Sequence, residues 1–395
     1  MAAHPLSVAV IGAGMAGRSH AAGYRAVNTV FGAGLPPIRL AAVADANTAL
    51  AEDAARRYGF DRALSSWEQV AEDPAIDAVS IVVGNDLHRP IAEALIAAGK
   101  HVLCEKPLAG SLDDARAMVA AEQAADVVTA VGYTFRRSPA IAAIREHVRN
   151  GELGDLSLFD GRYWCDYACD PRGPLTWRYR GGPGSGALAD IGAHVIDVAQ
   201  LLCGPIGSVS GGTLATHVDR RPLPLGAVIG HGTAPVSDET AAVENEDTAV
   251  FSARFRSGLA ASFSVSRTAF GMPNGLAFDV FGLTGRAGFD QHRPAEYLFD
   301  DTAPAPRTRG ARQVIVGPHA PYFAGGYPME APGVGGGNAE MFTYQCRAFL
   351  DQVVGTPDPL PPNATFADGL HTMQVIDAVV RSAHADGAAV PVPQS

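Results

Sequence analysis

The chain has 395 residues, 47% of them hydrophobic and 18% charged, a composition typical of a globular protein with room for two domains. Its 30 basic and 41 acidic residues give a net charge of −11, which argues against nucleic acid or an anionic membrane surface as a partner. No apolar run approaches the ~18 residues of a membrane span, and the N-terminal stretch lacks the charged region of a signal peptide. We therefore expect a cytoplasmic protein.

The five cysteines are scattered along the chain and odd in number, which suits reduced thiols better than a disulfide framework. Cys165 and Cys169 are four residues apart, but no second pair of Cys or His accompanies them to complete a zinc site. We therefore expect no bound metal.

The first predicted element is a strand that runs into a glycine-rich turn, in the sequence VAVIGAGMAG from residue 8. Such a turn binds a dinucleotide when Gly12 permits a tight bend, Gly14 lets backbone approach a pyrophosphate, and Gly17 lets a helix pack on the strand. The next residues, RSHAAGYRAV, continue as a helix whose N-terminus offers N–H groups to phosphates. A merely structural glycine turn is the alternative interpretation. The residues expected to bind the dinucleotide here are Gly12, Gly14, Met15, Ala16 and Gly17.

A second predicted strand ends at Asp45, whose carboxylate can accept hydrogen bonds from the adenosine ribose. Asp45 follows Gly17 by 28 residues rather than the usual ~20, and the Gly- and Pro-bearing segment 28–37 accounts for the longer connection. A carboxylate repels a 2′-phosphate, and no Arg or Lys directly follows Asp45. The pattern favours NAD over NADP as the cofactor, and a solvated Asp at a strand end is the alternative.

Predicted strands and helices keep alternating through the first third of the chain, which indicates an α/β Rossmann domain with a parallel, doubly wound sheet. Ligands of such sheets bind at the carboxyl ends of the strands. The polar residues that follow strand ends here are Asn85, His88, Glu105, Lys106, Tyr133 and Arg136. We expect this dinucleotide-binding domain to occupy residues 1–135.

Beyond residue 135 the pattern changes to strand-like runs separated by Gly-, Pro- or Asp-rich turns, mostly without helices between them. It predicts an α+β domain with a large, mostly antiparallel sheet over residues 136–395. Helices are expected at 185–204, 339–355 and 366–387, the last of which can pack back on the first domain. Residues 303–337 are rich in Gly, Pro and aromatic residues, and we expect them to form a long loop that closes over a substrate or covers a partner subunit. The alternating strands predict an apolar sheet face that one chain cannot cover, and therefore a homodimer or homotetramer.

Residues that can carry chemistry gather in two short motifs, EKP at 105–107 and DIGAH at 190–194. Asp190 and His194 are four apart on a predicted helix, so both side chains emerge on one face and the carboxylate can tune the imidazole. A histidine is the usual proton acceptor for an alcohol, and Lys106 at a strand end can stabilise negative charge on the reacting oxygen. Taken singly, the Asp190 and His194 pair also fits a surface ion pair, and EKP also fits an ordinary end of a strand. Behind a dinucleotide turn, they indicate an active site.

The combination of GAGMAG, the loop with Asn85 and His88, EKP and GSGALADIGAHVIDVAQLLCG resembles the Gfo/Idh/MocA family, which includes inositol dehydrogenases and glucose-fructose oxidoreductase. The resemblance covers nearly the whole chain and implies a Rossmann domain followed by an open-faced sheet that oligomerisation buries. It implies that the catalytic lysine is Lys106 and that the catalytic Asp/His pair is Asp190 and His194. Cofactor contacts implied by the resemblance, besides the glycine turn, are Asp45, Asn85, His88, Glu105 and Lys106.

The substrate pocket is the part where the chain departs from the family pattern. Val83 and Gly84 stand where many relatives have Thr-Pro, and Arg137 stands where an aromatic residue is common. Sugar sites combine aromatic platforms with fixed polar groups. The candidates for substrate contacts are Lys106, Tyr133, Arg136, Trp164, Asp166, Tyr167, Trp177, Arg178, Asp190 and His194. A core position is the alternative for both tryptophans, and an ion pair within the fold is the alternative for Arg136.

Together these features predict an NAD-dependent dehydrogenase that oxidises a ring hydroxyl of a cyclitol or sugar, such as an inositol, aldose, glycoside or anhydrosugar, to the keto product. On this hypothesis His194, assisted by Asp190, takes the hydroxyl proton, Lys106 steadies the oxygen, and the hydride moves to nicotinamide. Two alternatives keep the same motifs: a glycoside hydrolase that uses bound NAD without net redox change, and a non-catalytic nucleotide-sensing regulator. The joint presence of the three catalytic candidates disfavours the regulator.

Overall fold

The computed structural model describes residues 4–30, 34–182, 184–226, 228, 232, 234–302, 310–323, 331–333, 337–356 and 360–394. The chain forms two compact units, Met1–Pro139 with Gly317–Leu370, and Ala140–Val316 with His371–Ser395. The segment from Gly317 to Leu370 therefore packs with the first unit, although the sequence predicts a second domain from residue 136 onward. The domain boundaries stay a prediction, because a packing unit can include segments from either side of a domain boundary.

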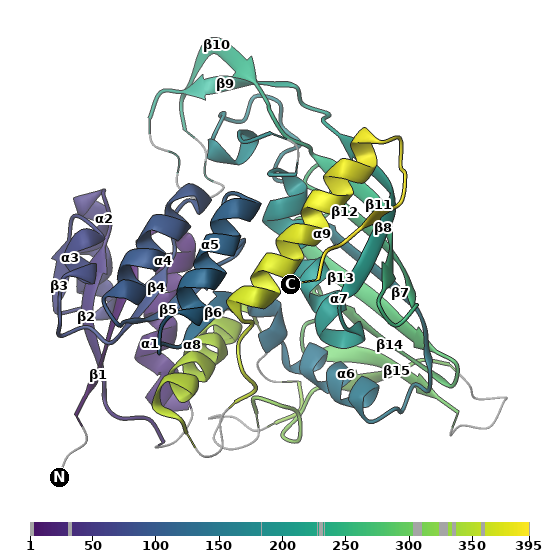
Figure 1. The fold of residues 1–395 in the computed structure, drawn as a ribbon, viewed down its shortest axis with the longest axis horizontal. Helices are drawn as coiled ribbons and strands as arrows, with labels where there is room; N and C mark the ends of the chain where they lie inside the picture. Colours follow the sequence, from purple (N-terminus) through teal and green to yellow (C-terminus); the bar gives the residue numbers. More distant parts are fainter. Residues whose placement is uncertain are drawn as a thin grey trace. The chain divides into compact units, whose positions relative to one another are not determined.

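The first unit is built on a six-stranded parallel sheet in the order β3-β2-β1-β4-β5-β6 (Figure 1). Its strands are β1 (Leu6–Ile11), β2 (Ile38–Ala44), β3 (Arg62–Leu64), β4 (Ala78–Ile81), β5 (His101–Glu105) and β6 (Thr129–Gly132). The strand order reverses between β1 and β4, and ligands of doubly wound sheets bind at that point. The central strands are almost wholly buried, as in sheets covered on both faces. The prediction of an α/β Rossmann fold is confirmed.

Helices connect these strands, and one helix from much later in the chain joins them. The connecting elements are α1 (Met15–Val30), α2 (Thr48–Tyr58), α3 (Glu68–Ala71), η1 (Asn85–Leu87), α4 (His88–Ala97), α5 (Leu112–Gln123) and η2 (Thr134–Arg137). The later helix, α8 (Asn338–Val354), packs against α1. A Cβ on Gly23 of α1 would lie 3.0 Å from Cys346 Sγ of α8, so a glycine lets the two helices approach closely. Val8, Val10 and Phe349 belong to the core that these elements enclose.

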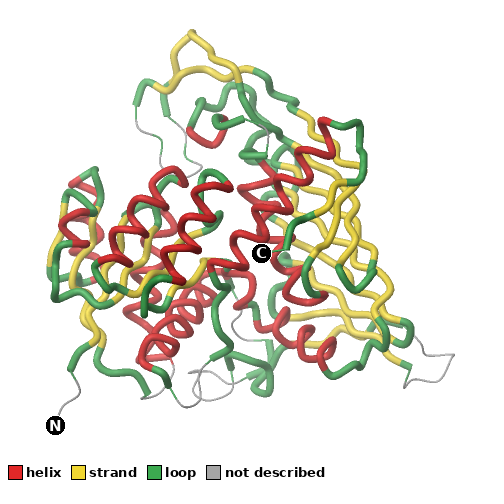
Figure 2. Tube along the Cα trace, viewed as in Figure 1, coloured by secondary structure: helices red, strands yellow, loops and turns green. Residues whose placement is uncertain are grey.

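The second unit contains a nine-stranded sheet in the order β16-β15-β14-β13-β7-β12-β11-β8-β17. Its strands are β7 (Leu156–Trp164), β8 (Ile206–Ala215), β11 (Thr248–Phe255), β12 (Ala260–Ser266), β13 (Gly275–Gly282), β14 (Gly285–Asp290), β15 (Glu296–Asp301), β16 (Arg312–Ile315) and β17 (Val390–Pro391). Neighbouring strands are antiparallel except β7 and β12, which confirms the mostly antiparallel sheet. Figure 2 draws the strands in yellow and the helices in red. A separate two-stranded sheet joins β9 (Arg220–Pro224) and β10 (Val236–Ala242).

Two helices in the described part of the second unit lie where the sequence predicts them, whereas the helix at Pro139–Arg149 was not predicted. The helix predicted at 185–204 begins as a π-helical segment, η4 (Leu188–Gly192), and continues as α7 (Ala193–Cys203). The other helices are α6 (Pro139–Arg149) and α9 (Phe366–His384), and the boundary between the units falls within α9. None of the helices in the described part of the chain is long and apolar enough to cross a membrane.

One face of the nine-stranded sheet is buried under helices, and its core is aromatic. The His147 ring of α6 stacks on Phe299 with centroids 4.1 Å apart, and a Cβ on Gly161 of β7 would lie 2.8 Å from Val195 of α7. Phe159 and Phe263 pack against one another on this face, with ring centroids 5.6 Å apart. The alternating burial of β7, β11 and β12 reflects this one-sided cover.

The opposite face of the sheet is chemically mixed, which corrects the expectation of an uncovered apolar face. Leu158 and Val250 are 40% and 45% exposed on it. The alternate positions of β7 and β12 on the same face are mostly polar: Asp160, Arg162, Ser262, Ser264 and Ser266. Period-2 alternation locates a face correctly, but serines and charged residues at the outer positions make this one only partly apolar.

Candidate active site

The glycine-rich turn between β1 and α1 has the geometry that a bound dinucleotide requires. Gly12 has φ of +102°, and a Cβ there would lie 2.0 Å from a backbone carbonyl oxygen. A Cβ on Gly17 would lie 1.9 Å from the Gly12 carbonyl oxygen, so no side chain fits between helix and strand. A Cβ on Gly14 would meet nothing within 4 Å, so this position is open to an approaching pyrophosphate. Met15, which is exposed, and Ala16 start α1, whose first N–H groups have no partners within the helix.

Asp45 directly follows β2, and its carboxylate is fixed beside the glycine turn. Oδ2 accepts a hydrogen bond from Ala13 N at 2.8 Å, and Oδ1 accepts one from Asn47 N at 2.8 Å. Each carboxylate oxygen keeps further acceptor capacity, so a ribose hydroxyl can also donate to it. The contact with Ala13 therefore fits the predicted role of Asp45 toward the adenosine ribose.

Asn85 and His88 follow β4, as predicted, but in different environments. Asn85 is half-buried at the start of η1, whereas His88 is fully buried at the start of α4. His88 Nδ1 lies 3.0 Å from the Pro107 carbonyl oxygen, and Nε2 lies 3.2 Å from the Val83 carbonyl oxygen. Burial lowers the pKa of His88. His88 thus ties the ends of β4 and β5 together, and its predicted cofactor contact stays a prediction that this placement supports only indirectly.

A buried hydrogen-bond network fixes Glu105 at the end of β5. Glu105 Oε1 accepts hydrogen bonds from His20 Nε2 at 3.0 Å and from Gln345 Nε2 at 3.5 Å. His20 Nδ1 lies 2.9 Å from Ser80 Oγ, which lies 2.7 Å from the Tyr24 hydroxyl. Residues of α1, β4, β5 and α8 therefore share one polar network inside the first unit. Sequence reasoning assigns Glu105 to the cofactor but misses these partners, because they are distant along the chain.

Lys106 is the residue after Glu105 and is half-buried. The peptide bond between Lys106 and Pro107 is cis. A Cβ on Gly132, at the end of the neighbouring strand β6, would lie 2.3 Å from Glu105 Oε1, so a glycine there leaves room for the carboxylate. The Lys106 backbone N–H donates a hydrogen bond to Glu105 Oε2 at 3.3 Å, so the fixed carboxylate also contacts the backbone of Lys106.

Tyr133 and Arg136 follow β6 in the same unit. Tyr133 is buried, and the Arg136 guanidinium carbon lies 6.0 Å from the centroid of its ring. Arg136 NH1 lies 3.3 Å from Asp368 Oδ2 at the start of α9, so the ion pair expected as the alternative role of Arg136 is present. An ion pair does not preclude a substrate contact, which stays a prediction.

Arg137 and the described part of the predicted long loop form a packed cluster. Arg137 is 1% exposed, and it donates hydrogen bonds to the Tyr322 hydroxyl at 3.1 Å and to Asn363 Oδ1 at 2.6 Å. Tyr322 stacks on Tyr344 of α8 with ring centroids 5.2 Å apart. Tyr322 is therefore part of the first unit's interior. The sequence also suggests that the loop residues His319, Tyr322 and Tyr327 close over a substrate or cover a partner subunit; His319 is exposed, and Tyr327 lies outside the described residues.

Asp190 and His194 lie on successive turns of one continuous helix in the second unit, as predicted. Asp190 belongs to the π-helical segment η4, and His194 is the second residue of α7. π-helical turns are frequent at functional sites. The helix rests on the sheet through Gly192, where a Cβ would lie 3.3 Å from Val265, and the His194 ring lies 6.0 Å from the Tyr163 ring.

Two side chains hold the carboxylate of Asp190. The Tyr167 hydroxyl donates a hydrogen bond to Asp190 Oδ2 at 2.8 Å, and Arg178 Nε lies 3.7 Å from the same oxygen. Burial raises the pKa of Tyr167, so the phenol keeps the proton that it donates. Arg178 also lies over the ring of Trp177, 4.4 Å from its centroid, and Trp177 is 55% exposed rather than a core residue. No local sequence pattern indicates the hydrogen bond from Tyr167 to Asp190, because the two residues are 23 apart in the chain.

Trp164 points to the other face of the sheet. Tyr163, the residue before it, faces His194, and successive residues of a strand point to opposite faces. Trp164 Nε1 donates a hydrogen bond to Ser264 Oγ at 3.0 Å, and Arg162 lies over its ring. This placement does not support a substrate contact for Trp164. Strand alternation instead places Tyr163 on the face of the sheet that carries His194, a position that sequence reasoning missed. Asp166, the remaining candidate, is half-buried just beyond β7.

Comparisons with known proteins agree with this geometry over both parts of the chain. Residues 6–133 match the model of an oxidoreductase family with an NAD-binding Rossmann fold, and residues 141–288 match the GFO/IDH/MocA C-terminal domain. Levoglucosan dehydrogenase from Pseudarthrobacter phenanthrenivorans is 35% identical over 392 residues, which cover 98% of each chain. Myo-inositol 2-dehydrogenase from Thermotoga maritima is 26% identical over 297 residues, which cover 75% of this chain and 78% of the relative.

Solved structures show the same relationship. The structure of levoglucosan dehydrogenase in complex with NADH matches with a TM-score of 0.90 at 32% identity, over 99% of this chain and 100% of that chain. Its complex with NADH and levoglucosan matches with a TM-score of 0.89 at 33% identity and the same coverage. This chain therefore belongs to the Gfo/Idh/MocA family of oxidoreductases, with an NAD-binding Rossmann fold in its N-terminal part.

Proposed function

We propose that the protein is an NAD-dependent dehydrogenase that oxidises a ring hydroxyl of a sugar or cyclitol to a ketone. The observation that carries this proposal is the fixed carboxylate of Asp190, held by Tyr167 and Arg178 one helical turn before His194. A carboxylate that supports an imidazole is suited to removing a hydroxyl proton. The glycine turn of the first unit fits the dinucleotide that such an oxidation requires.

The proposed chemistry divides between three side chains. His194 takes the proton of the reacting hydroxyl, and the negative charge of Asp190 stabilises the imidazolium that results. Lys106 donates a hydrogen bond to the same oxygen and stabilises the negative charge that develops on it. NAD, when bound, supplies the acceptor for the hydride that leaves the carbinol carbon.

The cofactor is proposed to lie along the carboxyl edge of the parallel sheet. Asp45 selects NAD over NADP, because its carboxylate repels a 2′-phosphate and Ala46 and Asn47 provide no compensating positive charge. His88 acts by holding the ends of β4 and β5. The residues proposed to contact NAD are Gly12, Gly14, Met15, Ala16, Gly17, Asp45, Asn85, Glu105 and Lys106.

The substrate class that we propose first is an anhydrosugar or a related pyranose. It rests on the relative named levoglucosan dehydrogenase, which shares 35% identity with this chain over 98% of its length. Trp177 offers an exposed aromatic face beside Arg178, the combination that sugar sites use. The side chains proposed to contact the sugar are Lys106, Tyr133, Arg136, Asp166, Trp177, Arg178, Asp190 and His194.

A substrate screen tests the proposal directly. Purified protein is mixed with NAD or NADP and with levoglucosan, inositols, aldoses or glycosides, and the absorbance of the reduced cofactor is followed. We expect NADH to form with at least one free polyol, and the anhydrosugar to give the highest kcat/KM. Cleavage of a glycoside without net NADH formation would favour the hydrolase alternative. NADH binding without turnover of any substrate would favour the regulator.

We also propose that the chain works as a homodimer or homotetramer in the cytoplasm. The open-faced sheet of the family resemblance supports assembly, since its outer face carries the half-exposed Leu158 and Val250. The five cysteines are free thiols, as is usual in a reducing compartment.

A further inference from the structure

Three consecutive polar residues between β10 and β11 are buried although nothing in the reaction uses them. Asn245 and Glu246 are each 2% exposed, and Asp247 is 0% exposed. Buried polar groups are costly unless hydrogen bonds satisfy them, so their partners indicate what they do. These partners lie in the second unit.

Glu246 binds the start of the helix that carries the proposed catalytic pair. Its Oε2 accepts a hydrogen bond from Gly184 N at 2.7 Å, and its Oε1 accepts one from Leu188 N at 2.9 Å. Its backbone carbonyl oxygen accepts a third from Ala187 N at 3.0 Å. The first N–H groups of a helix have no partners within it, so an acidic side chain from another segment here acts as a cap and complements the helix dipole.

Gly186 shows how closely this cap is fitted. A Cβ at Gly186 would lie 2.2 Å from the Glu246 carbonyl oxygen and 3.0 Å from Glu246 Oε1. Backbone atoms of Glu246 cannot give way without moving the strand that follows. The start of the helix is therefore set by backbone and side chain together.

The two neighbours of Glu246 hold the loop that leads to this helix. Asn245 Nδ2 donates hydrogen bonds to the carbonyl oxygens of Arg178, at 3.0 Å, and Arg180, at 2.9 Å. Arg267 NH1 donates to the Arg178 carbonyl oxygen at 2.9 Å, and its Nε lies 2.8 Å from Asp247 Oδ1 in a fully buried ion pair. The backbone that carries Arg178, one of the side chains around Asp190, is thus fixed by the same segment.

We propose that Glu246 is a positioning residue of the dehydrogenase, which holds the helix start so that Asp190 and His194 meet the reacting hydroxyl. Glu246 has no contact with substrate or cofactor in this proposal, which rests on the proposed function. A small displacement of catalytic groups costs up to about 100-fold in rate, because proton transfer requires a near-attack geometry. The effect is therefore expected in kcat, with cofactor binding unchanged, since the cofactor residues lie in the first unit.

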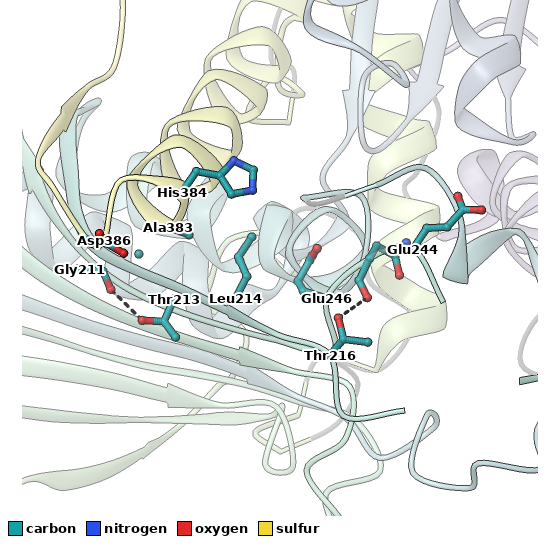
Figure 3. Close-up of a pocket in the computed structure, with 12 residues that line it drawn as sticks. Gly211, Thr213, Leu214, Thr216, Glu244, Glu246, Ala383, His384 and Asp386 are labelled. Atoms are coloured by element: carbon teal, nitrogen blue, oxygen red, sulfur yellow. Dashed lines mark hydrogen bonds between the residues drawn. The ribbon is translucent and has the colours of Figure 1, made fainter. Parts of the chain in front are cut away.

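Glu244 provides a matched control for Glu246. Glu244 and Glu246 both line an open groove of about 590 Å³ whose other lining residues include Thr216 and His384 (Figure 3). Glu244 Oε2 accepts a hydrogen bond from Gly181 N, not from the helix start. Glu244→Gln therefore removes a carboxylate charge from the groove and leaves the cap intact.

The experiment compares Glu246→Ala, Glu246→Gln and Gly186→Ala with wild type and Glu244→Gln, after circular dichroism has shown that each variant folds. Turnover is expressed per NADH-binding site, and amide hydrogen exchange is followed in the peptide covering residues 184–193. We expect Glu246→Ala to lower kcat about 10- to 100-fold with unchanged NADH affinity and faster exchange in this peptide. Glu246→Gln keeps one acceptor oxygen and should lose about 3- to 10-fold, because a typical hydrogen bond contributes about 1 kcal/mol.

The outcomes separate this inference from the proposed function. Exchange in the 184–193 peptide needs no substrate, so loss of protection in Glu246→Ala supports the cap even if no sugar is oxidised. An active wild type together with a kcat for Glu246→Ala within twofold of it overturns the positioning role. If Glu246→Ala fails to fold, Glu246→Gln and Gly186→Ala decide, and wild-type turnover and exchange in both would also overturn it.

Discussion

At the scale of single residues, the most consequential contact is the one that sequence spacing cannot show, the hydrogen bond from Tyr167 to Asp190. It fixes one oxygen of the carboxylate at 2.8 Å, while Arg178 lies 3.7 Å from the same oxygen. A carboxylate with a fixed orientation supports an imidazolium better than one that rotates freely, because its reorganisation cost is already met.

Tyr167→Phe should lower kcat about 10- to 100-fold, because it removes one hydrogen bond to a charged group and lets Asp190 rotate. KM for NAD should stay unchanged. Steady-state kinetics on the best sugar from the screen provide the measurement, with Tyr58→Phe on α2 as a control for loss of a phenol hydroxyl. Unchanged turnover in Tyr167→Phe would show that Asp190 keeps its orientation without this hydrogen bond.

Replacement of the proposed acid–base groups should affect turnover far more than cofactor binding. His194→Ala should lower kcat about 10²- to 10⁴-fold, the usual contribution of general acid–base catalysis, and Lys106→Ala should act similarly through the oxygen that it stabilises. The double variant should lose much less than the product, because both groups act on one proton and one oxygen. Asp190→Asn should be milder than either. Near-normal turnover in His194→Ala would assign the base to another residue, with Tyr133 or His88 next to be tested.

Coenzyme preference should follow Asp45. Wild type should prefer NAD at least about tenfold, or 1.4 kcal/mol in binding terms. Asp45→Ala combined with Ala46→Arg should shift preference toward NADP, and it should also weaken both coenzymes, because Oδ2 of Asp45 accepts the Ala13 N–H of the turn. Comparison of kcat/KM for the two coenzymes measures the shift. A wild-type preference for NADP would show that Asp45 is not the ribose ligand.

At the scale of elements, His88 joins α4 to the ends of two strands and makes their junction sensitive to acid. Its ring nitrogens lie beside the carbonyl oxygens of Pro107 and Val83, and burial lowers its pKa from the ordinary value of 6.5. The unfolded chain therefore takes up a proton below that value while the folded chain does not. Stability contributed by this residue is present at neutral pH and is lost as the pH falls below about 6.5.

His88→Asn should lower the free energy of unfolding at pH 7 and should flatten its decline between about pH 7 and pH 5. One group contributes at most about 1.4 kcal/mol per pH unit to that slope. The slope should not vanish, because burial also lowers the pKa of His101. Urea unfolding at several pH values gives the slope, and His319→Asn, at an exposed position, should leave it as in wild type. An unchanged slope in His88→Asn would show that another group titrates.

At the scale of the whole molecule, the mixed outer face of the nine-stranded sheet limits how the chain can assemble. Leu158 and Val250 are half-exposed there among serines and charged residues. A face of this kind forms a specific interface only when its polar groups find partners, which favours a symmetric copy of itself.

Light scattering on the purified chain should show a dimer or tetramer at micromolar concentration. Val250→Asp with Leu158→Asp should shift the equilibrium toward monomer, because each buries a charge at the proposed interface. Leu225→Asp, at an exposed position outside the nine-stranded sheet, is the matched control. A monomeric wild type would overturn the proposed assembly.

Short motifs and periodic patterns in the sequence determined those structural elements that depend only on neighbouring residues. The three glycines of GAGMAG are each required by one conformation or one close approach, so their spacing predicts the turn and its ligand. Continuous apolar runs predict the buried strands of the parallel sheet, and alternation of apolar residues with a period of 2 predicts strands of the nine-stranded sheet. A period of about 3.6 predicts the helix of Asp190 and His194. These patterns depend on a few neighbouring residues, so they can be recognised without knowledge of the fold.

Only the tertiary structure decided which distant side chains meet. His20 and Gln345 reach Glu105 across 85 and 240 residues of chain, and Glu246 reaches Leu188 across 58. Burial of a polar group forces it to find a partner wherever the fold supplies one, so such pairs have no fixed spacing and no local signal. The same reason explains why motif reasoning can propose Lys106, Asp190 and His194 for the chemistry but does not identify the contacts that side chains such as Tyr167 and Glu246 make with the segments around them.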